Sequence, residues 1–600
     1  MNSTASLLII SCMLSMSQLD IDADTNRDGR IDGSTIEEEL EASQSVLILN
    51  NVDDDDRDGL PDNQNRVIDG KSDWEDLEPV CIRRVALPLN GEFRPLLTIE
   101  EVSEDVTLTR NRIRVFNAEG QEIIGPNSGQ THYLTADELR SLACCDQTIY
   151  VEGLKFRTCV RLLIIHGDEQ DELLLETSPF ILTPTTQSPK SNMVVDVGDS
   201  FSKDYIGRFV NACQAARVAP WIIHPEDASG ESWIQDEIEW GYTQTARHQI
   251  PVVLQMFRES RPSGLQGLAQ RLVRPGVGYF EVWNYGEDIS HQGAHDSGGN
   301  LEVTPPVPGH PLGRVYFGSR ATTSVPVFER RIDERFEFFF LQQGVQSPIN
   351  LRTDWLSVGH VDEVVTFLPT NGGKTFVMLL ASPRLGIELL HRMGDAADLD
   401  MRYWKFIDRA QIPAPQHSSP PKVKDLRDLK FSVGAEEPRP VYSFDEYNLG
   451  IDKQIFGADH NQPDPDSIKG IFMAELGLTA DQIIEVPVLF RNEGSGWAAG
   501  AVCPNMVNLA SMGEFCLVGE PFIPLFKDDF GASLQRVGLK PLWIDTWINF
   551  HVNGGNVHCS SNVVREPFNI NWWKVTPPKL TDAPMLEEMK QPRSEIRPTL

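Results

Sequence analysis

The hydrophobic pattern of this 600-residue chain changes at a Pro- and Thr-rich stretch, "LTPTTQSPKS", residues 182–191. Before it, short apolar or alternating runs lie between polar turns, which is typical of strands in a β-sandwich; examples are "SVLILN", "HYLTADEL", "TIYVEGLKF", "VRLLIIH" and "DELLLETS". After it, helical patterns such as "YIGRFVNACQAARV" alternate with strand patterns such as "IPVVLQMF", "TFVMLLAS" and "PLWIDTWINFHV". This alternation predicts that an α/β domain follows the sandwich.

The predicted sandwich covers residues 18–177, and the predicted α/β domain covers residues 178–578. Residues 579–600 are Pro-rich and charged, so we expect a flexible tail. Residues 7–16 have the length of a signal-peptide core, but no Lys or Arg precedes them. A strand that opens the first domain is therefore the favoured interpretation, and a secretory signal is the alternative.

The composition excludes several classes of function. With a net charge of −34 and a pI near 4.7, the chain is not expected to bind nucleic acid or an anionic membrane. No apolar run reaches the ~18 residues of a membrane span. The nine cysteines are scattered and contain no C-x-x-C pair, which argues against a disulfide framework or a structural zinc site. Free thiols indicate a reducing compartment, so a cytoplasmic location is favoured over secretion.

The acidic charge is concentrated near the N-terminus. Residues 20–78 contain 20 Asp and Glu against 5 Lys and Arg, a net charge of −15. Within them, residues 24–32 and 54–62 share the pattern D-x-[DN]-x-D-G-x-x-D. Oxygen ligands at positions 1, 3 and 5, with glycine at position 6, allow a short loop to wrap around Ca²⁺. The repeat therefore predicts calcium as a cofactor, with several ions bound.

The predicted calcium ligands include both loops and the carboxylates around them. They are Asp24, Asn26, Asp28 and Asp32 in the first loop, and Asp54, Asp56, Asp58 and Asp62 in the second, with Asn51, Asp53, Asp55, Asp69, Asp73 and Asp76 close by. Position 12 is Thr35 or Asn65, so the Glu of an EF-hand is missing. A solvated acidic run is the alternative, but carboxylates this dense would repel one another in the absence of cations.

Three distant stretches contain reactive side chains. "SWIQDEIEWGY" contains Asp236, "DWLSVGHVDEVVTF" contains His360 and Asp362, and "VNGGNVHCSSN" contains Cys559 in a loop of small and polar residues. Cysteine is usually a small buried hydrophobe, so this setting indicates function, with an incidental thiol as the alternative. In an extended segment, His360 and Asp362 would face the same side. A lone histidine would more often be structural.

Together these residues supply a thiol, an imidazole and two carboxylates. Two carboxylates match the forked donors of a planar guanidinium. A thiolate can attack the central carbon of that group, and an imidazole can protonate the leaving amine. The set predicts hydrolysis of a guanidine.

Seven motifs resemble, in order, the catalytic domain of protein-arginine deiminases: "WIQDEIEWGY", "DSGGNLEVTPPV", "PLGRVYFG", "DWLSVGHVDEVVTFLP", "LLASPR", "PNMVNL" and "NVHCSSNVVREPFNINWWKVTPP". "LDIDADTNRDG" and "LNNVDDDDRDG" resemble that family's calcium-binding, immunoglobulin-like subdomain. The resemblance extends over about residues 18–578. It implies an immunoglobulin-like sandwich followed by a pentein fold, a five-bladed α/β propeller. It also implies calcium-dependent conversion of peptidyl-arginine to peptidyl-citrulline in protein or peptide substrates.

The resemblance also implies residue roles. Cys559 would be the nucleophile that forms a thiouronium intermediate, and His360 the acid and base. Asp236 and Asp362 would hold the guanidinium, with Trp233 and Val358 lining the slot for the methylene chain. Calcium in the catalytic domain would be held by Gln235, Glu237, Glu239 and Glu302, with backbone oxygens of Gly298 and Leu301. We expect attack to require the thiolate before substrate binds.

The chain departs from the family pattern in two places. We expect no counterpart of the family's first N-terminal subdomain in this sequence, which leaves the oligomeric state open. In "FRESRPSG", residues 257–264, only Arg261 aligns with the family's Arg-x-Arg substrate clamp, and the second position is Ser263. A small-molecule guanidine hydrolase acting on free arginine or agmatine is therefore the alternative function. A catalytically silent calcium-binding module is a third, which the four occupied catalytic positions disfavour.

Overall fold

The chain divides into two compact units. Unit 1 contains residues 1–180, 243–250 and 273–278, and unit 2 contains residues 181–242, 251–272 and 279–600. The computed structural model describes residues 19–31, 45–65, 68, 70–84, 94–101, 111–228, 230–256, 265, 267–282, 294–319, 332–407, 417–433, 438–462, 464–493 and 498–575. The predictions for residues 1–18 and for the tail 579–600 lie outside this set, and the boundaries 18–177 and 178–578 stay predictions. No helix among the described residues combines the length and apolar character needed to cross a membrane.

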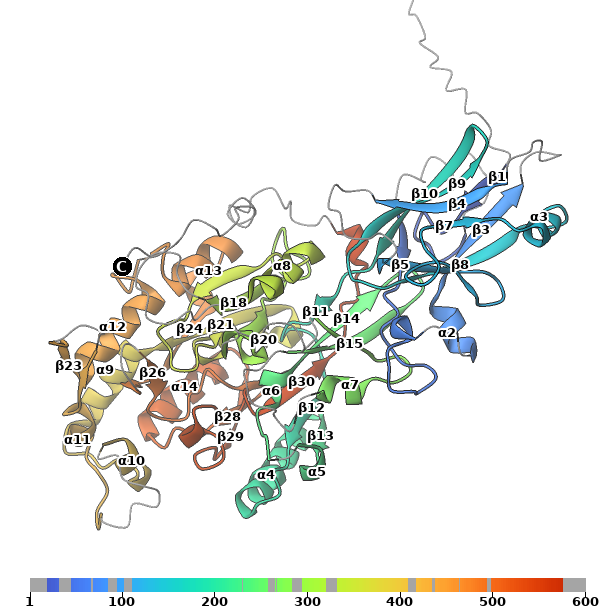
Figure 1. The fold of residues 1–600 in the computed structure, drawn as a ribbon. Coiled ribbons are helices and arrows are strands. Elements are labelled where there is room, and N and C mark those ends of the chain that lie inside the picture. The colour runs from blue at the N-terminus through green and yellow to red at the C-terminus, as the bar shows by residue number, and fades with distance from the viewer. Residues whose placement is uncertain are drawn as a thin grey trace, which may run out of the picture. The chain divides into compact units, whose positions relative to one another are not determined.

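Unit 1 contains two five-stranded sheets. The first has the order β1 (Leu19–Asp22), β3 (Glu78–Arg84), β8 (Gln147–Gly153), β5 (Ile113–Phe116), β6 (Glu122–Ile124), and all its pairs are antiparallel. The second has the order β2 (Val46–Ile48), β10 (Glu169–Thr177), β9 (Cys159–His166), β4 (Leu96–Glu101), β7 (Thr131–Tyr133). In this sheet β2 and β10 are parallel and the other pairs are antiparallel. Both sheets appear in blue and cyan in Figure 1.

The two sheets of unit 1 share one hydrophobic core. Leu19 and Val80 of the first sheet and Val46 and Leu97 of the second belong to a single cluster of buried side chains. This follows from alternation, because successive side chains of a strand point to opposite faces and the apolar set is buried. The immunoglobulin-like topology itself stays a prediction.

The predicted strand over "HYLTADEL" is wrong in its second half. Strand β7 ends at Tyr133, and Ala136–Leu142 form helix α3. Thr135 Oγ1 accepts a hydrogen bond from Glu138 N at 3.2 Å, and Glu138 Oε2 accepts one from Thr135 N at 2.6 Å. This reciprocal cap satisfies two backbone donors at the start of the helix. The T-x-x-E spacing that produces it is present in the sequence.

Four sheets of unit 2 are built alike: an antiparallel strand pair, then a helical crossover to a third, parallel strand. They are β30 (Ser561–Arg565), β12 (Pro189–Val195), α4 (Ser200–Ala216), β13 (Ala219–Ile223); β17 (Leu301–Val303), β18 (Val315–Ser319), α8 (Glu334–Gln343), β19 (Ile349–Arg352); β20 (Val365–Thr370), β21 (Thr375–Ser382), α9 (Pro383–Met393), β24 (Ile483–Pro487); and β27 (Ala510–Met512), β28 (Phe515–Gly519), α14 (Pro524–Arg536), β29 (Lys540–Ile544). Parallel neighbours need such a crossover, which explains the alternation of helical and strand patterns. Figure 1 shows α4 beside β12 and β13, and α14 beside β28 and β29.

Unit 2 also contains smaller elements. The order β11 (Ile181–Leu182), β14 (Ile238–Gln244), β15 (Gln249–Gln255), β16 (Gly278–Glu281) forms a four-stranded sheet, parts of which group with unit 1. Two strand pairs are β22 (Lys430–Ser432) with β23 (Val441–Ser443), and β25 (Phe490–Asn492) with β26 (Ala499–Ala501). Further helices are α5 (Pro225–Ala228), α6 (Ile234–Glu237), α7 (Leu268–Leu272), α10 (Trp404–Ile407), α11 (Val423–Arg427), α12 (Phe444–Phe456) and α13 (Ile468–Leu476). The five-bladed propeller stays a prediction.

Candidate active site and metal-binding clusters

Five short segments that directly precede strands of unit 2 supply the candidate active site. Asp236 lies in α6 before β14, Gly299 in the 3₁₀ turn η4 (Gly298–Asn300) before β17, and Asp362 in the 3₁₀ turn η5 (Val361–Glu363) before β20. Asn508 precedes β27, and Cys559 precedes β30. Helix α6 contacts η4 and β30, and η4 contacts η5. Residues that are distant in the sequence therefore meet at the starts of neighbouring strands.

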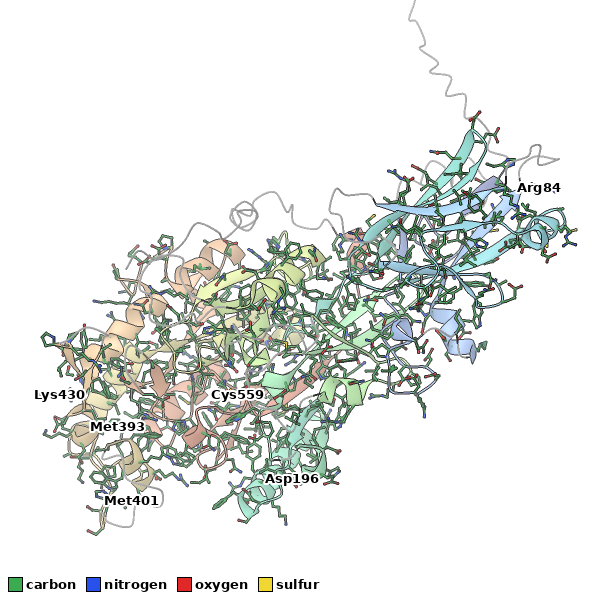
Figure 2. The ribbon with its side chains drawn as sticks, in the orientation of Figure 1. Arg84, Asp196, Met393, Met401, Lys430 and Cys559 are labelled. Carbon is green, nitrogen blue, oxygen red and sulfur yellow. The ribbon has the colours of Figure 1, made fainter. Side chains whose placement is uncertain are left out.

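The thiol of Cys559 is buried among polar groups. Its Sγ lies 3.4 Å from Asp362 Oδ2 and accepts a hydrogen bond from Asn508 Nδ2 at 3.1 Å. Asn508 Oδ1 accepts hydrogen bonds from the backbone N–H of both His558 and Cys559, at 3.0 and 3.3 Å. The asparagine thus fixes the loop that carries the thiol. Figure 2 shows Cys559 within unit 2.

The surroundings of Cys559 favour the thiol over the thiolate. Burial, together with the charges of Asp362 and Asp236, raises the pKa of Cys559 well above its ordinary value. A thiolate would add a third negative charge beside two carboxylates. The thiolate expected before substrate binding therefore stays a prediction, and this geometry opposes it. A cation between the two carboxylates would instead favour the thiolate of Cys559.

His360 lies on the same site as the two carboxylates. Its Nδ1 is 3.6 Å from Asp236 Oδ1, and the side chains of His360 and Asp362 are almost fully buried. His360 directly precedes the 3₁₀ turn η5, so the two residues are not in an extended segment as their spacing predicted. The turn, not strand alternation, brings both side chains to the site.

Gly299 has no room for a side chain. A Cβ built on it would lie 2.6 Å from His360 Nδ1 and 3.1 Å from both Asp236 Oδ1 and Asp362 Oδ2. Such contacts are shorter than the sum of van der Waals radii, so any other residue would push the catalytic groups apart. The glycine allows the imidazole and both carboxylates to converge, and sequence reasoning had assigned it no role.

The other predicted substrate contacts lie beside the thiol, with one exception. Val358 lines the same pocket as Cys559 and Asn508. The Trp233 ring packs so closely on Gly555, another residue of this pocket, that a Cβ there would lie 2.2 Å from the ring. Arg261 lies outside the described residues.

A second cavity contains three of the six metal ligands predicted for the catalytic domain. Gln235, Glu239 and Glu302 line it, with His558 and Arg565. Burial raises the pKa of Glu239 well above its ordinary value, reinforced by the charges of Glu302 and Asp362. Burial likewise raises the pKa of Glu302 to about 7. Buried oxygen ligands that repel one another fit a hard divalent cation.

The remaining predicted ligands lie near this cavity without lining it. Glu237 is buried in α6, and its backbone oxygen accepts hydrogen bonds from Met256 N and Gln255 Nε2, both at 2.8 Å. Gly298 and Leu301 stand at either end of η4, where Leu301 N donates to Gly298 O. Among the described residues, the cavity therefore gathers three of the predicted side-chain ligands.

His558 is the principal residue that the sequence did not reveal. Its Nδ1 lies 2.9 Å from Asp362 Oδ2, and its Nε2 lies 3.1 Å from Glu302 Oε1. Burial opposes a charge on this ring, but the two carboxylates raise its pKa above the ordinary value. Its position next to Cys559 was the available signal. Its partners come from distant segments, which a local motif cannot show.

The two acidic loops of unit 1 have the same geometry. In the first, Asp28 N donates to Asp24 Oδ1 and Asn26 Oδ1, both at 2.9 Å, and Gly29 N donates to Asp24 Oδ2 at 2.8 Å. The second repeats this pattern: Asp54 and Asp56 accept from Asp58 N, at 3.0 and 2.9 Å, and Asp54 accepts from Gly59 N at 2.9 Å. Both glycines have positive φ, 91° and 89°. Asp32 and Asp69 lie outside the described residues.

Alternate residues of the second loop belong to two different groups. Asp54, Asp56 and Asp58 form one group whose ligand atoms all lie within 4.8 Å of one another, and Asp53, Asp55 and Asp76 form the other. Burial raises the pKa of Asp76 to about 8, reinforced by the charges of Asp53 and Asp55. The predicted ligands Asp62 and Asp73 belong to the same surroundings, and burial with their mutual repulsion raises the pKa of Asp62 to about 9.

Three oxygens in or beside the inner group of Asp53, Asp55 and Asp76 fit a cation directly. Asn51 Oδ1, Asp53 Oδ1 and Asp55 Oδ2 are buried and make no hydrogen bond to any described residue. A buried oxygen without a donor costs free energy that a bound cation recovers. Asn51 Nδ2 meanwhile donates to Asp73 Oδ1 at 3.2 Å, which holds the amide oxygen away from Asp73.

The comparisons with known proteins identify one family for most of the chain. The family model "Protein-arginine deiminase (PAD)" matches residues 168–437 and 448–574. Protein-arginine deiminase type-4 of Mus musculus is 26% identical over 93% of this chain and 83% of its own length. The human type-3 protein is 28% identical over 95% and 84%, and the human type-4 protein 30% identical over 68% and 57%.

Several solved structures are similar to this chain at low sequence identity. C. jejuni agmatine deiminase matches with a TM-score of 0.35 and 9% identity, over 66% of this chain and 98% of its own. The putative arginine deiminase of Porphyromonas gingivalis matches with a TM-score of 0.33 and 11% identity, over 65% and 99%. The family model alone covers more than half of the chain, which confirms the resemblance seen in the motifs: the chain belongs to the protein-arginine deiminase family.

Proposed function

We propose that this protein is a calcium-dependent protein-arginine deiminase, which hydrolyses peptidyl-arginine to peptidyl-citrulline and ammonia. The observation that carries the proposal is the convergence of Asp236, His360 and Asp362 on Gly299, with Cys559 Sγ 3.4 Å from Asp362. Two carboxylates that flank a thiol can hold a guanidinium with its carbon beside the sulfur. Family membership supports the same reaction.

In the proposed mechanism, Asp236 and Asp362 bind the guanidinium, and Trp233 and Val358 line the slot for its methylene chain. The charge of the bound guanidinium lowers the cost of ionising Cys559, whose proton passes to His360. The thiolate forms a C–S bond to the guanidinium carbon. One C–N bond then breaks, and that nitrogen takes a proton from the imidazolium of His360 and leaves as ammonia. An S-alkylthiouronium cation remains on Cys559.

Hydrolysis of this intermediate reverses the roles. A water molecule adds to the same carbon and gives a proton to His360. The C–S bond breaks, and its electron pair returns to the sulfur of Cys559. The ureido group of citrulline remains, and its extra proton passes to solvent, where it converts ammonia to ammonium.

Calcium is the proposed cofactor, and each predicted set of oxygens is a proposed site. The catalytic unit would hold it with Gln235, Glu237, Glu239, Glu302 and the backbone of Gly298 and Leu301; unit 1 would hold it with Asp24, Asn26, Asp28, Asp32, Asn51, Asp53, Asp55, Asp62, Asp73 and Asp76. The bound ions supply positive charge that offsets the repulsion among these carboxylates. The raised pKa values of Glu239, Glu302 and Asp62 support this assignment.

We further propose that unit 1 is an immunoglobulin-like sandwich and unit 2 a pentein propeller. Two sheets that share one core support the first proposal. The second is supported by the repeated three-stranded sheets and by the five short segments that precede strands at the site. The substrate class follows from the family, and Arg261 is the proposed contact to the peptide.

The test is citrulline formation from an arginine-containing peptide across a calcium titration, with free arginine and agmatine alongside. We expect turnover of the peptide that rises steeply with calcium. Cys559→Ala should abolish it, whereas Cys516→Ala, which changes another buried thiol, should retain it. Turnover of free arginine or agmatine with the peptide untouched would instead establish a small-molecule guanidine hydrolase.

A further inference from the structure

One of the two carboxylates predicted to hold the substrate, Asp362, is linked through a single side chain to Glu302, which is predicted to hold the cation. The ring of His558 lies between them, with Nδ1 2.9 Å from Asp362 Oδ2 and Nε2 3.1 Å from Glu302 Oε1. Each ring nitrogen therefore lies within hydrogen-bonding distance of one carboxylate oxygen. His558 has no place in the proposed reaction, yet it contacts both binding groups.

This contact occupies the side of Asp362 that faces the thiol. Asp362 Oδ2 is shared between His558 Nδ1 and Cys559 Sγ, while Oδ1 is buried and makes no hydrogen bond to a described residue. A guanidinium that binds in two-pronged fashion needs both oxygens of a carboxylate. The ring therefore competes with the substrate for Asp362 Oδ2.

The other nitrogen competes in the same way with a cation. Glu302 Oε1 is the atom that His558 Nε2 contacts, and Glu302 lines the cavity that also holds Gln235 and Glu239. A cation bound to that oxygen excludes a hydrogen-bond donor from it. Loss of the contact to Glu302 removes one of the two bonds that hold the ring against Asp362.

We propose that His558 is a positioning residue that couples cation binding at Glu302 to guanidinium binding at Asp362. In the absence of the cation, the ring holds the two carboxylates together and blocks Asp362. When the cation takes Glu302, the ring releases Asp362 for the substrate. The inference rests on the proposed function for the identity of the two ligands.

The test measures binding rather than turnover. In a Cys559→Ala background, which cannot consume the ligand, an Nα-blocked arginine amide is titrated by calorimetry in calcium and in EDTA. We expect the amide to bind at least about fivefold more tightly in calcium, the lower end of usual coupling between sites. In the double variant with His558→Gln, the ratio should fall below about twofold, because the affinity in EDTA rises.

Matched variants separate this coupling from a structural role. His391→Gln changes a surface histidine that pairs with Asp445, and should leave the ratio unchanged. His558→Asn provides a second variant if His558→Gln does not fold, as judged by thermal melting. A merely structural His558 would weaken binding in both solutions and leave the ratio intact, and this result overturns the inference.

The outcome is distinguishable from failure of the proposed reaction. Calcium-dependent turnover by the unmodified protein, with the same binding ratio in both variants, keeps the reaction and rejects the coupling. A ratio that depends on His558, without any citrulline formed, keeps the coupling and rejects the reaction. If the amide binds in neither solution, Asp362 is not a guanidinium site and the inference fails.

Discussion

The two units solve the problem of buried carboxylates differently. In the inner group of unit 1, Asp53 and Asp55 each have a buried oxygen without a hydrogen-bond partner among the described residues. In unit 2, Asp362 contacts His558 and Cys559, and Glu302 contacts the other side of the same ring. The inner group of unit 1 thus leaves oxygens open to a cation from solution, whereas unit 2 places an imidazole between its carboxylates. Under the proposed function, the acidic residues of unit 1 serve to bind cations, and those of unit 2 serve to exchange an imidazole for a cation or a guanidinium.

The largest effect should come from the shared carboxylate of unit 2. Asp362→Asn removes the charge that faces both Cys559 and His558, so a bound guanidinium loses one of its two anionic partners. We expect kcat/KM for a peptide substrate to fall about a hundredfold or more. Citrulline formation at saturating calcium measures this.

Asp354→Asn is the matched control for that variant. Asp354 lies in the same stretch but pairs with Arg352 at the surface, where an ion pair contributes little. It should retain activity within about twofold. Equal losses in both variants would contradict the role assigned to Asp362.

A smaller effect is expected on the calcium-dependent stability of unit 1. At a calcium concentration about a hundred times the dissociation constant, one bound ion stabilises the folded state by about 2.7 kcal/mol. Asp53→Asn should lose much of the rise in melting temperature that calcium gives. The substitution removes the charge of Asp53, whose Oδ1 is a buried oxygen that makes no hydrogen bond to a described residue. Calorimetric melting in calcium and in EDTA tests this, with the exposed Asp137→Asn of α3 as the control. An unchanged calcium response in Asp53→Asn would remove this residue from the ligands.

How far the sequence predicts these features depends on distance along the chain. The spacing of Asp24, Asn26 and Asp28 sets their geometry locally, and the second copy of the loop has the same hydrogen bonds. Asp236 and Cys559 were identifiable only from their motifs, because the contacts that unite them cross the whole unit. The turn at His360 and Asp362, by contrast, was expected to be extended, since a local pattern of apolar residues does not reveal a 3₁₀ turn.

His558 and Gly299 show what could not be predicted. The role of the glycine depends on three side chains that come from two distant segments, α6 and the turn at η5. The role of the histidine depends on two carboxylates from different elements, Glu302 of β17 and Asp362 of η5. Neither residue belongs to a spacing rule, because three-dimensional packing alone brings their partners together.

A third cluster, distant in the sequence from the acidic loops, extends the comparison to pH. His460 Nδ1 lies 2.9 Å from Asp452 Oδ2, and its Nε2 lies 2.8 Å from Glu485 Oε1. Burial lowers the pKa of His460, but hydrogen bonds to the two carboxylates outweigh it and raise the pKa to about 9. The ordinary value is 6.5, so the stabilisation is full below about pH 6.5 and is lost as the pH rises through about 9.

We therefore expect the melting temperature of unit 2 to fall by a few degrees between about pH 6.5 and 9. His460→Gln should reduce that fall both in EDTA and in calcium. The charged ring of His460 is the cation of this cluster, so the effect does not depend on a bound metal ion. His391→Gln, at an exposed pair with Asp445, should leave the pH profile as it is. A profile that His460→Gln does not flatten would show that the ring is not charged in the folded protein.

The smallest effect should come from the outer face of the second acidic loop. Asp56 is exposed, and its carboxylate accepts a hydrogen bond from Asp58 N at 2.9 Å. Asp56→Ser keeps an acceptor for that bond but removes one charge from a solvated group. We expect the unfolding free energy in EDTA to change by less than about 0.5 kcal/mol, as is usual for surface substitutions.

The comparison of Asp56→Ser with Asp53→Asn then shows which face of the loop binds calcium more strongly. If the inner group holds the ions, calcium should raise the melting temperature of Asp56→Ser about as much as that of the unmodified protein. A response reduced as much as in Asp53→Asn would place a strongly bound ion at Asp54, Asp56 and Asp58. In that case burial would not determine the affinity of this loop for calcium, because the repeated D-x-D-x-D-G geometry would be enough to bind the ion at the surface.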